Sequence, residues 1–347
     1  MLRLFYAQLP AFARPDNPIM RYTLLRDGRR TSASTRFVRA LISALLLIVL
    51  LILGYQIATG FGSVALDDAQ LNALDSVFLV LYWPLIILQI GARLLAISAT
   101  TGVIAAETRT GTWESLKITT EGAKLTMRAR WASVFYRLRY VLLLIVAARV
   151  FFVIVALINF TSFQGQYLDL MVSGTTPLSQ MPNPIVSLAL SVLLASLTMV
   201  SALLLPFTAI AFDASLGMLI GTIARGRWLG ILGQVVILLV RLVISSIALW
   251  IGALALSFSP LVAGSGLGIS SVPGGGPLTW LGTLFGLTEG DLGLTLLHLP
   301  HLQRVWADID YGILIGLAVL LYALLQAALS QAMIRLAAWR AAHADRV

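Results

Sequence analysis

The 347-residue sequence contains no cysteine and little charge, since only 11% of its residues are Asp, Glu, Lys or Arg. The absence of cysteine excludes disulfides, thiolate metal sites and cysteine nucleophiles. Soluble domains carry roughly 25% charged residues, and a chain with less than half that share cannot cover a water-facing surface. With 59% apolar residues and a mean hydropathy of +0.92, the sequence is typical of an integral membrane protein.

Six apolar stretches are long enough to cross a bilayer, which takes about 20 helical residues. We predict one all-α polytopic membrane domain over residues 1–347. The fourth stretch stays apolar beyond its predicted end, as far as Ile223, and Pro206 inside it predicts a bend or a break. The predicted spans are residues 39–59, 77–104, 140–160, 186–212, 229–256 and 311–334.

Lysine and arginine are distributed unevenly among the connections. Residues 1–39 hold eight of them, residues 105–140 hold seven, and residues 213–228 together with the tail from Arg335 hold five. The other connections hold Arg304 alone, together with eight acids. Because basic loops stay on the cytoplasmic side, we expect both termini in the cytoplasm and the chain in a bacterial inner or plasma membrane.

No catalytic or nucleotide-binding motif is evident. Neither Lys117 nor Lys124, the two lysines, follows a glycine, so the Gly-rich phosphate loop that ends in Gly-Lys is missing. His298 and His301, with acids nearby, form one metal-like group, which we interpret as interfacial. The net charge of +9 does not indicate nucleic acid, because the basic residues lie at the ends of apolar runs. We therefore expect no enzyme, no metal and no bound cofactor in this chain.

The connection 105–139 carries a helix signal. Gly111 permits a sharp turn, Thr112 can cap a helix, and Glu114 favours the positive end of the helix dipole. Trp113 starts an apolar edge at helical spacing. We predict a short helix that lies across the inner membrane face. A plain linker resting on lipid headgroups would give the same local pattern.

The same connection has a residue order seen in a known family. The matching residues are Glu107, Gly111, Thr112, Glu114, Leu116 and Thr119. The order resembles the coupling-helix segment of type-2 ATP-binding-cassette (ABC) exporter permeases, in which Glu, Gly-Thr, an acid, Leu, Thr-Pro and later Gly-Lys follow one another. With Trp113, the matching residues make up the predicted ATPase-coupling residues. Thr120 replaces the proline, Ala129 replaces the glycine, and Arg130 falls where the lysine stands.

A second resemblance lies in residues 1–38, before the first span. Asn17 and Pro18 suit a helix start, and Ile19, Tyr22 and Leu25 share one helix face. This segment is similar to the amphipathic elbow helix of the same permeases, although Tyr22 stands where an acid is common. The basic residues of the segment, which can meet headgroup phosphates, include Arg21, Arg26, Arg29 and Arg30.

The resemblance implies the permease half of an exporter, without a nucleotide site of its own. Its partners would be a separate ABC ATPase subunit, which binds ATP and Mg²⁺, a second permease subunit in a homo- or heterodimer, and membrane lipids. Two other classes stay open. An ion-coupled secondary carrier would show inverted repeats and an intramembrane acid, and a non-transporting membrane scaffold would use the inner helix to bind another cytoplasmic protein.

Arg93, Arg149 and Arg241 lie inside predicted spans. Each costs about 2.5 to 3.5 kcal/mol on insertion scales, so each needs a partner or water. We expect no carboxylate at their depth, because Asp213 lies near the inner end of the fourth predicted span. The arginines would then meet helix carbonyls, water or an anion.

Two hypotheses follow for these arginines. In the first, Arg93 and Arg241 line a wet cavity that receives an acidic group such as a lipid headgroup, with Gln89 and Gln234 on similar helix faces. In the second, the arginines are structural and bond to carbonyls freed by the prolines of the second and fourth spans, or extend outward to the membrane surface.

The outer connection 257–310 combines glycines with apolar patches that include Trp280 and Phe285. A flexible tether has no need of Trp and Phe. We therefore predict short helices that dip into the outer leaflet. A loop folded over the ends of the spans is the alternative.

Overall fold

The structure is a computed structural model, and it describes residues 10–27, 73–101, 122–161, 184–223, 227–255, 277–309 and 311–343, with 41, 45, 48, 49 and 51–56. The secondary-structure elements within these ranges are all helices. They are η1 (Ala11–Ala13), α2 (Pro18–Asp27), α4 (Ala73–Thr101), α7 (Gly122–Arg137), α8 (Arg139–Thr161), α11 (Pro184–Ile223), α12 (Arg227–Ala255), α14 (Pro277–Thr288), η4 (Leu292–Leu297), α15 (Leu299–Asp308), η5 (Gly312–Leu314) and α16 (Ile315–His343).

In the described part of the chain, five helices are long and apolar enough to cross a membrane, as expected of a multi-pass membrane protein. They correspond to the second to sixth predicted spans. The first, 39–59, falls largely outside the described residues, so the six-span layout stays a prediction. The five are Val77–Thr101, Arg139–Ile158, Val192–Ile223, Trp228–Ala255 and Gly312–His343.

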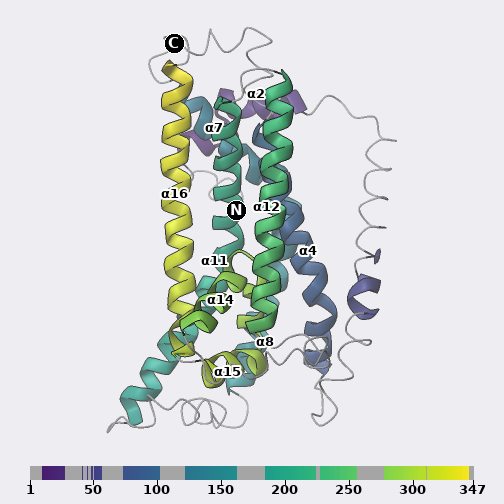
Figure 1. The fold of residues 1–347 in the computed structure, drawn as a ribbon, viewed down its shortest axis with the longest axis vertical. Helices are drawn as coiled ribbons and strands as arrows, with labels where there is room; N and C mark the ends of the chain where they lie inside the picture. The colour runs from purple at the N-terminus through teal and green to yellow at the C-terminus, as the bar shows by residue number, and fades with distance from the viewer. Residues whose placement is uncertain are drawn as a thin grey trace.

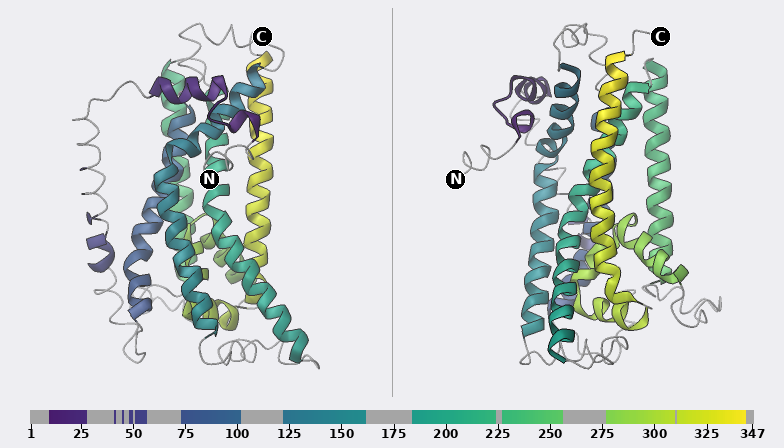
Figure 2. Two further views of the ribbon diagram at one scale, coloured as in Figure 1. Left: turned by 180° about the vertical axis from the view of Figure 1, so that it is seen from behind. Right: turned by 90° about the vertical axis from the view of Figure 1, so that its left-hand side faces the viewer.

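The helix α11 is longer than the predicted fourth span. Its 40 residues continue through Pro206 and Asp213 to Ile223, so the predicted end at residue 212 is wrong. Figure 2 shows that α11 bends along its length, as an internal proline predicts. Because the helix does not break, Asp213 lies inside the bundle, with 0% of its surface exposed.

The helix α16 continues nine residues beyond its predicted end at residue 334, to His343. This extension packs on other helices of the chain. Helices α7, α11 and α16 share one buried apolar cluster there, and tertiary packing of this kind prolongs a helix beyond what hydropathy requires. The cluster consists of Met127, Met218, Ile334, Ala338 and Ala341.

The bundle has two different ends (Figure 1). Helices α2 and α7 lie with the C-terminal end of α16 at one of them, which we call the α2 end. Helix α15 lies at the opposite α15 end, and α14 runs from there into the bundle. The short helices predicted within 257–310 are confirmed, since its described part forms α14, η4 and α15.

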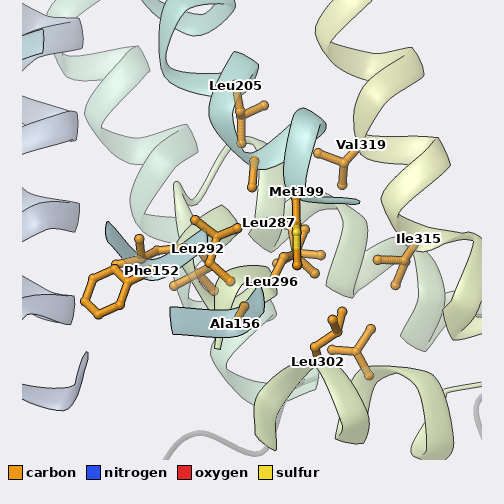
Figure 3. Packing of buried hydrophobic residues seen from close by; sticks show 14 of the residues in the cluster. Phe152, Ala156, Met199, Leu205, Leu287, Leu292, Leu296, Leu302, Ile315 and Val319 are labelled. Carbon is orange, nitrogen blue, oxygen red and sulfur yellow. The ribbon is translucent and has the colours of Figure 1, made fainter. Parts of the chain in front are cut away.

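Helix α14, the turn after it and η4 form a hairpin of residues 277–297, which we call the α14–η4 hairpin. All six residues of η4 are buried. Figure 3 shows Leu287, Leu292 and Leu296 of the hairpin among side chains from α8, α11, α15 and α16. Burial of this apolar surface holds the hairpin in the bundle.

Helix α12 is closely packed against the hairpin through glycine. A Cβ on Gly252 would lie 2.5 Å from the Cα of Gly286, a distance that no real side chain tolerates. Glycine at both positions therefore lets the two helices touch backbone to backbone. Much of the rest of α12 exposes apolar side chains such as Leu232 and Leu239, as a lipid-facing helix does.

At the α2 end, α2 starts as predicted. The Asn17 side chain accepts a hydrogen bond from the Ile19 backbone N–H (3.0 Å), which is a helix cap. The predicted shared face of Ile19, Tyr22 and Leu25 stays a prediction, whereas the residue of α2 that is fully buried is Met20 and Tyr22 is 47% exposed. Met20 packs on Ala132 of α7, so the neighbouring helix decides which face is covered.

Candidate functional site

Six charged side chains meet inside the bundle, and we call them the charge cluster. Three are arginines and three are carboxylates, so their formal charges balance. Each is at most 7% exposed. They come from α4, α8, α11, α12 and the turn of the α14–η4 hairpin, and they are Arg93, Arg149, Arg241, Asp213, Glu289 and Asp291.

Arg93 of α4 contacts all three carboxylates. Its Nε donates to Asp213 Oδ2 (2.7 Å) and its Nη1 to Asp291 Oδ1 (3.0 Å). Its Nη2 donates to Glu289 Oε2 (3.0 Å). The guanidinium presents its donors in a fixed fork, which suits several carboxylates around one cation.

Arg241 of α12 shares two of these carboxylates. Its Nε lies 3.1 Å from Asp213 Oδ1, and its Nη2 lies 2.5 Å from Glu289 Oε2. Asp213 and Glu289 thus each bridge Arg93 and Arg241. In a low-dielectric interior, a buried charge is tolerated when opposite charges and hydrogen bonds surround it.

The expectation that no carboxylate lies at the depth of the arginines is wrong. Asp213 reaches them because α11 continues past it, and Glu289 and Asp291 reach them because the hairpin turn lies inside the bundle. A Cβ on Gly290, between the two acids, would collide with backbone of α12, and Asp291 adopts a left-handed φ of 59°. The tight turn thus depends on Gly290. A sequence signal was present, since three span arginines need counter-charges and Glu-Gly-Asp interrupts an apolar outer segment.

Arg149 of α8 has a different role. Its Nη1 donates to the Ala202 carbonyl of α11, and its Nη2 donates to Gln89 Oε1 (2.6 Å). Ala202 lies four residues before Pro206, and proline has no N–H for that carbonyl. The hypothesis that a span arginine bonds to a carbonyl freed by a proline is thus confirmed for Arg149, whereas Arg93 and Arg241 pair with acids.

Polar groups of α16 complete one side of the cluster. Tyr322 Oη and Gln326 Nε2 both donate to Glu289 Oε1, the latter at 3.3 Å. Gln326 Oε1 in turn accepts from Thr208 Oγ1 of α11 (3.0 Å). Every buried oxygen of the Glu289 carboxylate therefore has a partner, and the hairpin is tied to α16 as well as to α4 and α12.

The geometry leaves little room for an anion beside Arg93 and Arg241. Both arginines already face carboxylates of the chain, and the gap next to Gln89 and Arg149 does not admit a water molecule. Gln89 belongs to the network, whereas Gln234 is half-buried on α12, and no hydrogen bond within the described ranges joins it to the cluster. The transport-path role of these residues stays a prediction.

The predicted coupling residues lie outside the described residues, because the structure does not describe 102–121. They are Glu107, Gly111, Thr112, Trp113, Glu114, Leu116 and Thr119. Of the predicted elbow residues, Asn17 caps α2, Pro18 is its first residue, Arg21 is exposed, and Arg26 lies within it. Arg130, on α7, is buried.

His298 and His301 meet near the α15 end. Their Nδ1 atoms lie 2.5 Å apart, and the His298 ring stacks on Phe78 of α4, with ring centroids 4.1 Å apart. Across the described ranges, no group of three or more His, Cys, Asp or Glu residues is arranged to hold a metal ion.

The site is therefore a charge-balanced network that joins helices, rather than an open pocket lined by unpaired catalytic groups. Comparisons of the chain with protein-family models, with curated proteins and with solved structures find no match.

Proposed function

We propose that the chain is the transmembrane permease subunit of an ATP-driven exporter of the type-2 ABC class. The observation that carries the proposal is the contact between α7 and α2, because α7 follows the segment 107–119 that resembles a coupling helix. Helix α7, which follows that segment, packs at the α2 end against α2, the helix that resembles an elbow. The α14–η4 hairpin enters the bundle from the other side. These positions support the proposal, in which the elbow and the coupling helix lie on the inner side and the apolar loop before the last span lies on the outer side.

The charge at the α2 end supports a cytoplasmic position for it. Exposed basic residues of α2, α7 and the turn before α2 lie there, with few acids among the described residues. Basic residues favour the cytoplasmic side of a membrane. In the proposal, an ATPase subunit binds this end at residues 107–119, supplies ATP and Mg²⁺, and moves the spans. The exposed basic residues in the described ranges include Arg14, Arg21, Lys124 and Arg137.

The chain itself would be no enzyme in this proposal. Its buried acids are paired with arginines, so none of them is placed as a free general acid or base. A second permease subunit, identical or related, would complete the substrate path.

An ion-coupled secondary carrier is the second candidate, and one observation favours it. Asp213, Glu289 and Asp291 lie within the bundle, and intramembrane carboxylates are typical coupling sites for protons or sodium. The arginines at 2.5 to 3.1 Å weigh against it, because a carboxylate so paired has less affinity for a cation.

Affinity purification in mild detergent tests the proposal. An ATPase should co-purify with the wild-type chain and be lost with the double substitution Glu114→Arg and Leu116→Asp, because these put a charge reversal and a polar group into the docking helix. Asp345→Arg, an acid reversal beyond α16, is the matched control and should retain the ATPase. A chain that purifies alone and transports with an ion gradient would favour the carrier, and capture of a protein without ATPase activity would favour a scaffold.

A further inference from the structure

A short hydrogen-bond relay runs from the α14–η4 hairpin to the bend of α11. Asp291 Oδ1 accepts from Gln89 Nε2 (2.7 Å), and Gln89 Oε1 accepts from Arg149 Nη2 (2.6 Å). Arg149 Nη1 then donates to the Ala202 carbonyl. Asp291, Gln89 and Arg149 are each at most 2% exposed. The relay thus crosses three helices and the hairpin without contact with solvent.

The last bond of the relay replaces a backbone bond that the sequence cannot make. In an α-helix the carbonyl of residue 202 accepts from the N–H of residue 206, but Pro206 has none. A buried carbonyl without a donor destabilises the fold, because its lost hydration is not offset by a hydrogen bond. Arg149 supplies the donor from another helix, and α11 continues as a single helix through its bend.

Gln89 is suited to its place between Asp291 and Arg149. Its amide offers a donor and an acceptor on one rigid group, so it bonds a carboxylate on one side and a guanidinium on the other. Neither Glu nor Leu of similar size offers both. The amide therefore makes the orientation of Arg149 depend on where Asp291 lies.

The hairpin also touches the bend directly. A Cβ on Gly293 of η4 would lie 2.9 Å from Leu205 Cδ2 and 3.8 Å from Arg149 Nη1. Leu205 directly precedes the proline, and it is fully buried. The hairpin backbone, the bend and the arginine are thus packed at one point, where a displacement of the hairpin removes both a steric support and a hydrogen-bond partner.

We propose that Arg149 is a positioning residue that fixes the bend angle of α11 at Pro206. Through Gln89, this bend angle depends on whether the α14–η4 hairpin lies in its place inside the bundle. When the hairpin moves out, Asp291 leaves Gln89, and Arg149 loses its balancing charge and its orientation. The bend at Pro206 is then no longer held. The hairpin and the arm of α11 between residues 184 and 205 therefore move together. This inference goes beyond the proposed function and holds whether ATP or an ion gradient drives the chain.

A double-mutant cycle tests the role of Arg149. Pro206→Ala restores the missing N–H, so the purified chain should no longer need the arginine for that carbonyl. Arg149→Met should lower the thermal unfolding midpoint of the otherwise wild-type chain, and by about half as much when Pro206→Ala is also present, since Gln89 Oε1 still loses its donor. The matched control is Arg241→Met, whose effect should be the same with and without Pro206→Ala. Equal effects of Arg149→Met in both backgrounds would overturn the proposal.

A distance measurement along α11 tests whether its bend depends on the hairpin. It reads the conformation directly, so it also applies to variants that unfold at a lower temperature. The chain lacks cysteine, so spin labels at Val192→Cys and Ile223→Cys report the bend of α11 alone. Both positions are exposed, and a straight helix would place them about 46 Å apart. Gln89→Leu, Asp291→Asn and Arg149→Met should shift and broaden the distance distribution, whereas Gln234→Leu on α12 should leave it unchanged.

Wild-type distributions for both Gln89→Leu and Asp291→Asn would show that the bend is independent of the hairpin, and the proposal would fail. These measurements use the chain without a partner. Their failure is therefore distinct from failure of an ATPase to co-purify, which bears on the proposed function alone.

Discussion

Arg93 of α4 and Asp213 of α11 are joined by a hydrogen bond of 2.7 Å, although they lie 120 residues apart in the sequence, and their side chains are 1% and 0% exposed. The pair fixes the depth at which α4 and α11 meet. It also places Asp213 where it can bridge to Arg241, 3.1 Å away. Glu289 and Asp291 of the hairpin contact the same arginines and complete the network.

Removal of one charge from this network should be costly. Asp213→Asn leaves Arg93 and Arg241 with an excess of positive charge in a low-dielectric interior, and the loss of one partner of a buried ion pair costs about 3 to 5 kcal/mol. We expect a clear drop in the thermal unfolding midpoint of the purified chain. Asp16→Asn, an exposed acid before α2, is the control and should change little. A stable Asp213→Asn chain would mean that water replaces the carboxylate.

Neutral replacement of a pair should cost less than loss of one member. Arg241→Met or Glu289→Met alone unbalances the charge cluster, whereas the double substitution keeps it neutral and exchanges an ion pair for apolar surface. We expect the double variant to unfold at a higher temperature than either single variant, as measured in detergent by fluorescence. Additive losses would contradict a direct interaction between the two groups at 2.5 Å.

The contact of α12 with the hairpin should tolerate no added atom. Gly252→Ala would place its Cβ 2.5 Å from Gly286 Cα, so the two helices must separate, at about 1 to 3 kcal/mol. Gly91→Ala on α4 is the matched control, because its Cβ would meet nothing within 4 Å and alanine favours a helix by about 1 kcal/mol. Unfolding midpoints should therefore move in opposite directions. A neutral Gly252→Ala variant would contradict the close backbone contact.

Chemical labelling of single introduced cysteines should place the α2 end and the α15 end of the bundle on opposite sides of the membrane. Lys124→Cys lies exposed on α7 at the α2 end, and Tyr311→Cys is 70% exposed before η5, on the side of α15. If basic residues mark the cytoplasm, an impermeant maleimide should label position 311 in intact cells and position 124 only after permeabilisation. Labelling of both positions from one side would contradict the proposed topology.

Much of the fold follows from local pattern. Five of the six predicted spans begin within a few residues of a helix start in the structure. In lipid, the backbone N–H and C=O groups of an apolar run must bond to each other, and a helix allows this. The continuation of α11 to Ile223 follows the apolar run beyond residue 212, whereas the end of α16 at His343 was not predictable from hydropathy. Their extensions pack on α7 through Met127, and that contact depends on partners distant in sequence.

The candidate site was predicted only in part. The arginines, Gln89 and the bend at Pro206 could be recognised, because a charge or a proline inside an apolar run always needs compensation. Their partners could not be assigned. In the sequence, Glu289 and Asp291 lie in a predicted outer loop. Only the turn of the hairpin inside the bundle brings them to Arg93.

The sequence by itself determined that the chain is a bundle of apolar helices with three arginines at membrane depth, since composition and run length decide what lipid will accept. The tertiary structure decided which group neutralises each arginine. Counter-charges act over a few ångströms, and the distances between residues 93, 149, 202, 213, 241 and 291 are set by how helices pack and how deeply a hairpin enters, neither of which is a property of any local stretch.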